Sequence, residues 1–280
     1  VGGVVLKRSH MPPRLEAHAK LDTFGQNFRL YGTDKNFTGT HGSATLGNKI
    51  GDWSFRLSVD RLDNHSHPTD FTAATAKTGA PAAAGQFTVV TGAHFDNNIA
   101  NSRRVSTAAT SMDHTVKDDG TLKIAYDVSP TVRATYTLNI WQNSSDKLVE
   151  SYLKDAAGNT IYGTSTAAGI YRYVRINGQD YSVTAPSISH AEAEYHMHGL
   201  SVKSQSGGTW DWELTASHFN QNKDVTRASS GNFGTTPSSD ATAGTISYAD
   251  GTGWQNLDAR GEWRPDGNLK SRHQVSFGFH

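Results

Sequence analysis

The chain of 280 residues has no cysteine. Disulfide bonds, thiolate metal sites and cysteine nucleophiles are therefore excluded. The sequence also has no run of about 18 apolar residues, which excludes a transmembrane helix, and no signal peptide is visible. The formal net charge is zero. A basic surface of the kind that binds nucleic acid is thus not indicated, and we expect no nucleic-acid partner.

Hydrophobic residues are scarce as well. They make up 35 % of the chain, whereas a soluble protein of this size needs an interior rich in Leu, Ile and Val. The apolar residues that are present are spread over alternating runs. In LKIAYDVSPTVRATYTLNIW, residues 122–141, apolar and polar residues alternate on both sides of a Ser-Pro turn. This period of two predicts a β-hairpin with one apolar and one polar face.

Enzyme motifs are missing from the sequence. There is no G-x-S-x-G elbow, no P-loop and no dinucleotide fingerprint. We therefore expect no enzyme, no catalytic residue and no cofactor. A row of four ionisable residues shares one face of a predicted strand: Glu192, Glu194, His196 and His198. One alternative is a metal site at this row, but we interpret it as a hydrated row facing a lumen. His65-x-His67 begins a long loop, where it would either contact a metal-bearing ligand or be solvated; we interpret it as solvated loop. We predict no metal site.

The connections between the predicted strands follow an order. After a first hairpin with its turn at 25–27, short turns alternate with long polar segments near 64–120, 143–189 and 220–252. In an up-and-down antiparallel sheet, alternate connections lie at opposite ends, so the tight turns share one end and the long loops share the other. Outer-membrane barrels have this asymmetry. Immunoglobulin-like sandwiches, with turn signals every ~8–12 residues, do not.

The tryptophans fall into two groups. Four of them adjoin short turns on the apolar faces of their strands: Trp53, Trp210, Trp212 and Trp263. Aromatic residues in such positions form the girdles of membrane barrels; the alternative is the core of a sandwich. Trp141 and Trp254 lie at the loop-side strand ends and fall on the polar face. We interpret these two as candidates for a ligand pocket, the alternative being interface aromatics after a one-residue register slip.

Several segments resemble one family. The residues VGGVV at 1–5 resemble the end of the plug of TonB-dependent outer-membrane receptors, although LKRS at 6–9 departs from the usual continuation. RLEAHAKLDTFGQNFRLYGT looks like the first barrel hairpin of these receptors, and SYLKDAAGNTIYG at 151–163 looks like one of their extracellular loops. LDARGEWRPDGNLKSRHQVSFGFH looks like a strand, a periplasmic turn and the next strand. The resemblance covers almost the whole chain and rests on diffuse patterns.

The resemblance implies a fold and a location. The fold would be all-β, an antiparallel up-and-down transmembrane β-barrel of 22 strands, of which about nine are present. Residues 1–10 would be the end of the plug and 11–280 the N-terminal part of the barrel. Both chain ends look cut, so we expect a fragment. The location would be the outer membrane of a Gram-negative bacterium, with lipid around a protein that is a monomer at full length.

The function implied by the resemblance is uptake of a scarce nutrient such as a ferric siderophore. The TonB complex, a further partner, would drive import through the plug, most of which is missing from these residues. Two alternatives remain: a passive porin-like channel, and a soluble secreted β-sandwich that binds glycans. The substrate is not indicated, because neutral net charge favours neither an anionic siderophore nor a neutral sugar.

Overall fold

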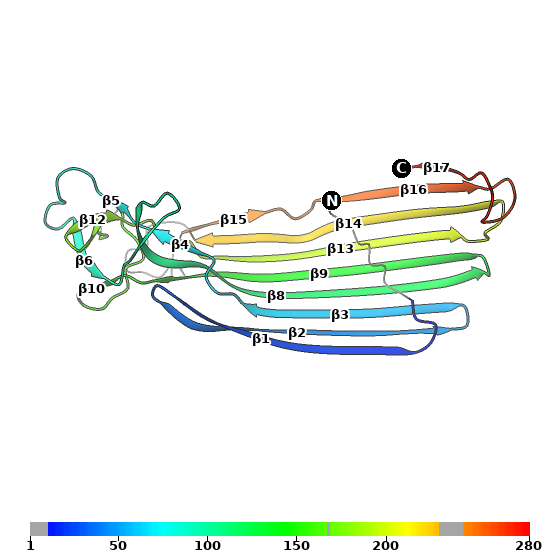
Figure 1. The fold of residues 1–280 in the computed structure, drawn as a ribbon, viewed down its shortest axis with the longest axis horizontal. Helices are drawn as coiled ribbons and strands as arrows, with labels where there is room; N and C mark the ends of the chain where they lie inside the picture. Colours follow the sequence, from blue (N-terminus) through cyan, green and yellow to red (C-terminus); the bar gives the residue numbers. More distant parts are fainter. Residues whose placement is uncertain (1–10, 167–168, 230–242) are drawn as a thin grey trace.

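The computed structural model describes residues 11–166, 169–229 and 243–280, which form β-strands and turns (Figure 1). Within these residues no helix is long and apolar enough to cross a membrane. A path of nine strands runs through the main sheet in chain order: β1 (Glu16–Leu30), β2 (Thr33–Ile50), β3 (Trp53–His65), β8 (Arg103–Ser129), β9 (Val132–Ser151), β13 (Ser189–Ser204), β14 (Trp210–Ser229), β16 (Gly253–Trp263) and β17 (Val275–Phe279).

All neighbours on this path are antiparallel. The all-β class and the antiparallel up-and-down order are therefore confirmed. The sheet is open, because β1 and β17 each pair with a single neighbour in the described chain. A closed transmembrane barrel thus stays a prediction.

The connections follow the predicted order. Short turns join β2 to β3, β8 to β9 and β13 to β14 at one end of the sheet, and the long segments emerge at the other end (Figure 1). The connection from β16 to β17 lies at the turn end as expected, but it covers residues 264–274 and is longer than the turn predicted there. The first hairpin turn, however, was predicted at 25–27 and lies at Tyr31 and Gly32. Gly25 is instead a strand residue opposite Thr38. Tyr31 takes the positive φ of 52° that this turn needs.

The strands also extend farther than the sequence predicts. Residues 103–120 belong to β8, 143–151 to β9 and 220–229 to β14, although all three ranges were expected in long loops. The physical reason is that strands pair through backbone groups, so the ladder continues where the side chains no longer alternate in polarity. The N-terminal residues 1–10, expected to end a plug, lie outside the described residues, as do 230–242 of the third long segment.

Cross-strand register defines two faces of the main sheet. One face carries Leu46, Leu57, Leu122 and Leu138, each directly opposite the next across β2, β3, β8 and β9; we call it the leucine face. The other carries Thr45, Ser58, Thr121 and Asn139 in the same arrangement; we call it the polar face. Directly paired residues share a face because side chains alternate along a strand.

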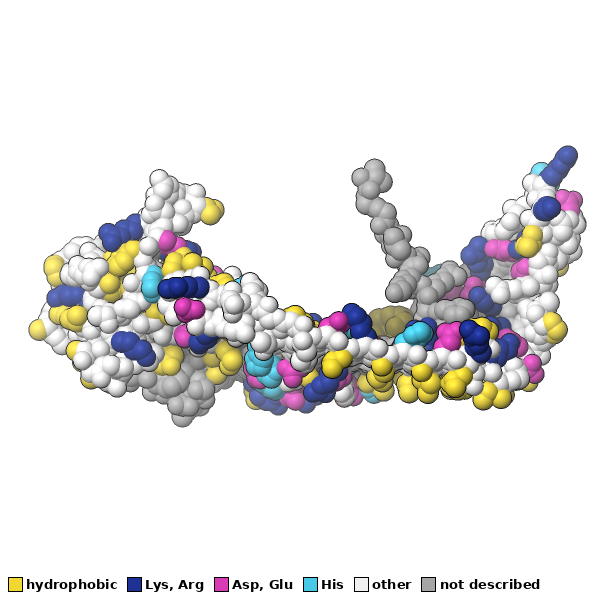
Figure 2. Space-filling view, turned by 60° about the horizontal axis from the view of Figure 1, so that its bottom comes forward, with side chains coloured by type: hydrophobic (Ala, Val, Ile, Leu, Met, Phe, Trp, Pro, Cys, Tyr) yellow, Lys and Arg dark blue, Asp and Glu magenta, His cyan; other side chains and the backbone are white. Residues whose placement is uncertain are grey.

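The four tryptophans beside the short turns lie on the leucine face at its turn end. Trp53 is opposite Tyr126 with ring centroids 4.7 Å apart, and Trp210 is opposite Trp263 at 6.4 Å. Trp53 and Trp210 are each 55 % exposed. Figure 2 shows hydrophobic side chains gathered along this side of the sheet toward the turn end, with charged and histidine side chains between them and the loops.

The main sheet is a single layer. The chain exposes 17153 Å², whereas a compact monomer of 30.3 kDa exposes about 11,800 Å² by the usual scaling of area with mass. Domains normally bury a sheet face against a second layer. Here the excess area follows from two broad sheet faces that the described residues leave uncovered.

Side-chain burial is concentrated instead in the long connections. Five short strands of segments 66–102 and 152–188 form a second sheet in the order β10 (Lys154–Asp155), β6 (Phe87–Thr91), β11 (Tyr173–Ile176), β12 (Gln179–Ser182) and β5 (Thr75–Ala76). Two further strands of the first segment, β4 (Asp70–Ala73) and β7 (His94–Asn97), pair with β8 in the main sheet. We call the second sheet and its connections the loop cap. Its core is apolar: Val90, Val105, Leu153, Ile161, Val174, Ile176, Tyr181 and Val183. Two segments that the sequence presented as loops therefore fold against each other.

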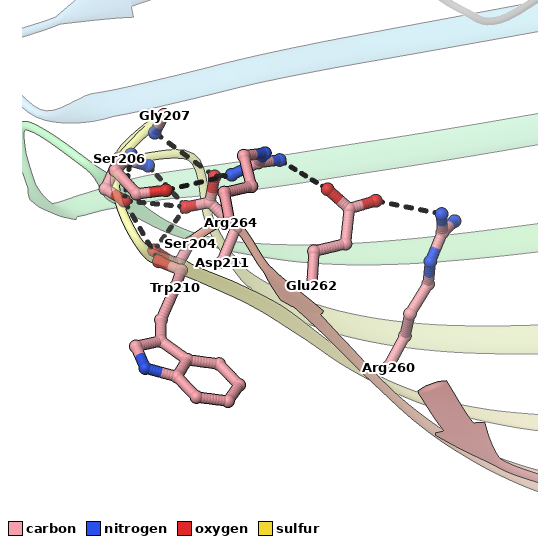
Figure 3. Close-up of polar contacts among 9 residues, drawn as sticks. Ser204, Ser206, Gly207, Trp210, Asp211, Arg260, Glu262 and Arg264 are labelled. Atoms are coloured by element: carbon pink, nitrogen blue, oxygen red, sulfur yellow. Dashed lines mark hydrogen bonds and ion pairs between the residues drawn. The ribbon is translucent and has the colours of Figure 1, made fainter. Parts of the chain in front are cut away.

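A polar network closes the opposite end of the sheet (Figure 3). The buried carboxylate of Asp211 accepts hydrogen bonds from the backbone N–H groups of Ser206 at 2.6 Å and Gly207 at 3.1 Å. Arg264 donates to the same carboxylate at 2.7 Å and also bonds Glu262. The network fixes the β13–β14 turn against the turn that follows β16.

Candidate ligand-binding surface

An aromatic row crosses four strands on the polar face. Its members are Trp141 on β9, Tyr195 on β13, Phe219 on β14 and Trp254 on β16. Neighbouring ring centroids are 5.0 Å apart for the first pair, 5.7 Å for the second and 5.8 Å for the third. These spacings lie within the range of attractive aromatic pairs.

The register explains how the row forms. Trp141 is directly opposite Tyr195, and Phe219 is directly opposite Trp254. Tyr195 is directly opposite Gln221, and Phe219 is directly opposite Met197. Tyr195 and Phe219 are therefore diagonal neighbours on the same face, and their rings meet edge to face at an interplanar angle of 63°.

The two ends of the row differ from its middle. Tyr195 has an aromatic neighbour on each side, and its hydroxyl donates a 2.6 Å hydrogen bond to Asp224. Among the described ring contacts, Trp141 and Trp254 each have one aromatic neighbour. Each indole therefore has one ring face that no described aromatic ring covers, and Trp254 is 48 % exposed. Flat apolar or aromatic ligand groups stack on such faces.

The sequence predicted Trp141 and Trp254 on the polar face, and the register places both there. Trp254 lies at the loop-side end of its strand as expected, next to the first residue of β16, but Trp141 lies within β9 and not at its end, because β9 continues to Ser151. The sequence missed Tyr195 and Phe219. Tyr195 was assigned to an apolar face, and nothing in the local pattern links it to a residue on β14 or β16.

The row of ionisable residues on β13 lies on the other face from the one predicted. His198 is opposite Leu138, so Glu192, Glu194, His196 and His198 share the leucine face and do not line the polar one. The error arose because Ala191, Ala193, Tyr195 and Met197 look apolar in sequence and suggested an apolar face. The leucine face is apolar near the turns and becomes ionic toward the loops.

This ionic zone of the leucine face, which we call the charged belt, is held by cross-strand pairs. His190 bonds Asp146 at 2.7 Å, and Glu192 accepts from Arg227 at 3.0 Å and Lys223 at 2.9 Å. These pairs join β9, β13 and β14.

The two members of His65-x-His67 go to different places. The ring of His65 stacks on His114 with centroids 4.0 Å apart, whereas His67 contacts Phe28 of β1 at 5.0 Å. Likewise, His196 pairs with Glu194 at 3.1 Å while His198 bonds the hydroxyl of Tyr136 at 2.8 Å. Neither His-x-His motif therefore brings its own two imidazoles together.

A further ion pair ties the first hairpin to the loop side of β8. Arg104 donates to Asp96 on β7 (His94–Asn97) at 2.6 Å, and the hydroxyl of Tyr31 bonds the same carboxylate. The hydrogen bond from Arg104, followed by that from Tyr31, lowers the pKa of Asp96 to about 2. The pair thus remains charged at neutral pH and anchors the β1–β2 turn near the loop cap.

Comparisons with known proteins returned no match among family models, curated proteins or solved structures.

Proposed function

We propose that this chain is a segment of an outer-membrane β-barrel that takes up a scarce nutrient, in the manner of the TonB-dependent receptors that its sequence resembles. The leucine face would contact lipid, and the polar face would line the lumen. The chain would act as a receptor and transporter and not as an enzyme, in the outer membrane of a Gram-negative bacterium.

The observation that carries this proposal is the exposed apolar zone of the leucine face. On β9, apolar residues of this face occur at every second position from Val132 to Ile140 and give way to Gln142. That run spans the ~9–11 residues that a tilted transmembrane strand requires. The aromatic residues at the turn end match the girdle at a membrane interface.

The exposure of the leucine face supports the same proposal. Soluble monomers rarely expose a contiguous apolar patch of more than a few hundred Å², and a sandwich would bury the apolar faces of two sheets against each other. The described residues contain no second sheet over the leucine face. In a membrane, lipid chains would contact these apolar side chains in place of a second protein layer.

The aromatic row suggests where a ligand would bind. It lies on the face proposed to line the lumen and toward the loop end of the sheet, where the loop cap stands. A planar ligand, such as the catechol rings of an iron chelate, would stack on the open face of Trp141 or Trp254. We propose these two residues as ligand contacts.

The first experiment is to sequence the DNA that flanks the coding region of this chain. We expect a signal peptide and a plug to be encoded upstream, and about 13 more alternating strands downstream. Together with the strands of this chain, these would make the 22 strands of large outer-membrane transporters. Further strands without a plug would replace the receptor by a passive channel. Flanks that encode neither would overturn the barrel and favour a soluble β-module.

The second experiment tests the ligand contacts. Equilibrium dialysis of the chain in detergent micelles against a radiolabelled ferric tris-catecholate should show binding. Because an aromatic stack contributes about 0.5–1.5 kcal/mol, Trp254→Ala should weaken binding by about 2- to 12-fold. Trp53→Ala, on the opposite face, is the matched control and should leave it unchanged. Equal losses in both variants would remove the aromatic row from the proposal.

A further inference from the structure

Two histidines from distant segments meet in the charged belt of the leucine face. His65, the last residue of β3, is directly opposite His114 on β8. Their rings are parallel within 3° and their centroids are 4.0 Å apart. Asp63, two residues before His65, lies on the same face because side chains alternate along a strand.

The three side chains converge. The Nε2 atom of His114 is 3.0 Å from Oδ1 of Asp63. One donor atom from each of Asp63, His65 and His114 lies within 4.8 Å of the other two, and within residues 11–166, 169–229 and 243–280 no other group of three potential ligands does so. This group is distinct from the aromatic row, which occupies the polar face.

We propose that Asp63, His65 and His114 bind a divalent transition-metal ion, with zinc as the preferred occupant. Two imidazoles and one carboxylate are a zinc donor set found in proteins, and three protein ligands leave the fourth tetrahedral position open for water. Calcium and magnesium are disfavoured because they prefer all-oxygen ligands.

The geometry needs little adjustment to accept the ion. Zinc-to-ligand distances of about 2.0–2.1 Å place tetrahedral donors about 3.3 Å apart, and the bonded pair of His114 and Asp63 is already closer than that. His65 is exposed, so its ring can rotate toward the other two, and this rotation breaks its stack on His114. The ion would replace the hydrogen bond between His114 and Asp63.

Neighbouring residues of the charged belt define the limits of the site. Asp146 lies directly opposite His114, but His190 bonds it at 2.7 Å. Arg61, on the other side of Asp63 along β3, is paired with Asp118 at 3.0 Å. Asp146 and Arg61 are thus both engaged by other partners.

The test is calorimetric titration of zinc chloride into the full chain in detergent micelles. One ion should bind per chain. Asp63→Asn keeps the shape of the side chain and should weaken binding at least about tenfold, the low end of the loss seen when even an outer-shell partner of a metal ligand is removed. His114→Ala should weaken it further.

The matched control is His218→Ala. His218 and His198 form a second cross-strand histidine pair on the same face, with centroids 6.2 Å apart, and the described hydrogen bond of that pair is to a tyrosine hydroxyl. This variant should keep the affinity of the parent chain. Absence of zinc binding by the parent, or equal losses in His114→Ala and His218→Ala, would overturn the proposal. Far-UV circular dichroism of each variant verifies that the strands have formed. If His114→Ala does not fold, the zinc affinity of Asp63→Asn decides the test.

Discussion

Arg264 and Asp211 form an ion pair of 2.7 Å at the turn end of the main sheet, and both residues are buried (Figure 3). Asp211 also holds the β13–β14 turn through the backbone N–H of Ser206. One carboxylate therefore connects two turns that are far apart in the sequence.

Arg264→Leu should destabilise the chain strongly. Removing one member of a buried pair leaves the other charge without its partner, which costs about 3–5 kcal/mol. Arg260→Leu is the control, because Arg260 is an exposed partner of Glu262 and exposed pairs contribute less than about 1 kcal/mol. Urea unfolding in detergent micelles, followed by far-UV circular dichroism, compares the two. Equal shifts of the midpoint would contradict the assigned role of Arg264.

The two faces of the sheet should differ in their access to detergent. In micelles of a brominated alkyl maltoside, bromine quenches the fluorescence of a tryptophan that touches the alkyl chains. Variants that each retain a single tryptophan, with the others changed to Phe, report the quenching at each position separately. Trp53 should be quenched strongly and Trp254 weakly, because they lie on opposite faces. Strong quenching of Trp254 would mean that the polar face also contacts alkyl chains.

The loop cap should lose stability in acid. Asp180 is buried and accepts hydrogen bonds from Arg175 at 2.6 Å and from the backbone N–H of Ala82 at 2.7 Å. The bond from Arg175 is the main cause that lowers the pKa of Asp180 below its ordinary value of 3.8. A carboxyl group whose pKa is lower in the folded state stabilises that state above the unfolded pKa and loses this contribution as the pH falls through the folded value.

Hydrogen exchange of the Val174 and Ile176 amides measures this effect. Protection should be constant from about pH 6 to pH 4.5 and should decrease below about pH 4, where the unfolded carboxyl begins to bind protons. Asp180→Asn cannot titrate, and its protection should be lower at neutral pH and less dependent on pH. A parent chain whose cap is equally protected at about pH 3 and pH 6 would contradict the prediction.

Gly92 should tolerate no side chain. Its φ is +91°, and a Cβ there would lie 2.0 Å from the carbonyl oxygen of Tyr152. Gly158 is the control, because its φ is +85° but a Cβ there would meet nothing within 4 Å. Gly158→Ala should cost about 1–2 kcal/mol for the left-handed backbone alone, and Gly92→Ala should cost more because the backbone must also move. Thermal unfolding of the two variants makes the comparison, and a smaller loss for Gly92→Ala would be the contrary result.

The local patterns in the sequence predicted the strands well. The hairpin of residues 122–141 has its turn between Ser129 and Val132, as the alternation and the Ser-Pro pair indicated. The first turn was misplaced because Gly25 resembles a turn residue. In the structure Phe24 instead lies against Gly39 on the opposite strand. A Cβ at Gly39 would come within 2.4 Å of the Phe24 ring, so the packing of this ring requires a glycine at position 39.

The candidate sites were predicted only in part. Trp141 and Trp254 could be assigned to the polar face from alternation alone, but their connection through Tyr195 and Phe219 depends on the register of three strand pairs. The pairing of His65 with His114 has no local signal at all, since the conspicuous His65-x-His67 motif points to a different neighbour. The loop cap was missed because its strands have two to five residues, too short for a periodic pattern.

The sequence by itself determined the β-strands, the polarity of their faces near the turns and the alternation of short and long connections. These properties are local, since the direction of a side chain along a strand depends only on the residue's position in the alternation. The tertiary structure decided which rows of side chains meet, where the leucine face changes from apolar to ionic, and how the long connections fold. Those outcomes depend on the register between segments distant in the chain, because each contact forms between residues whose local sequences carry no information about one another.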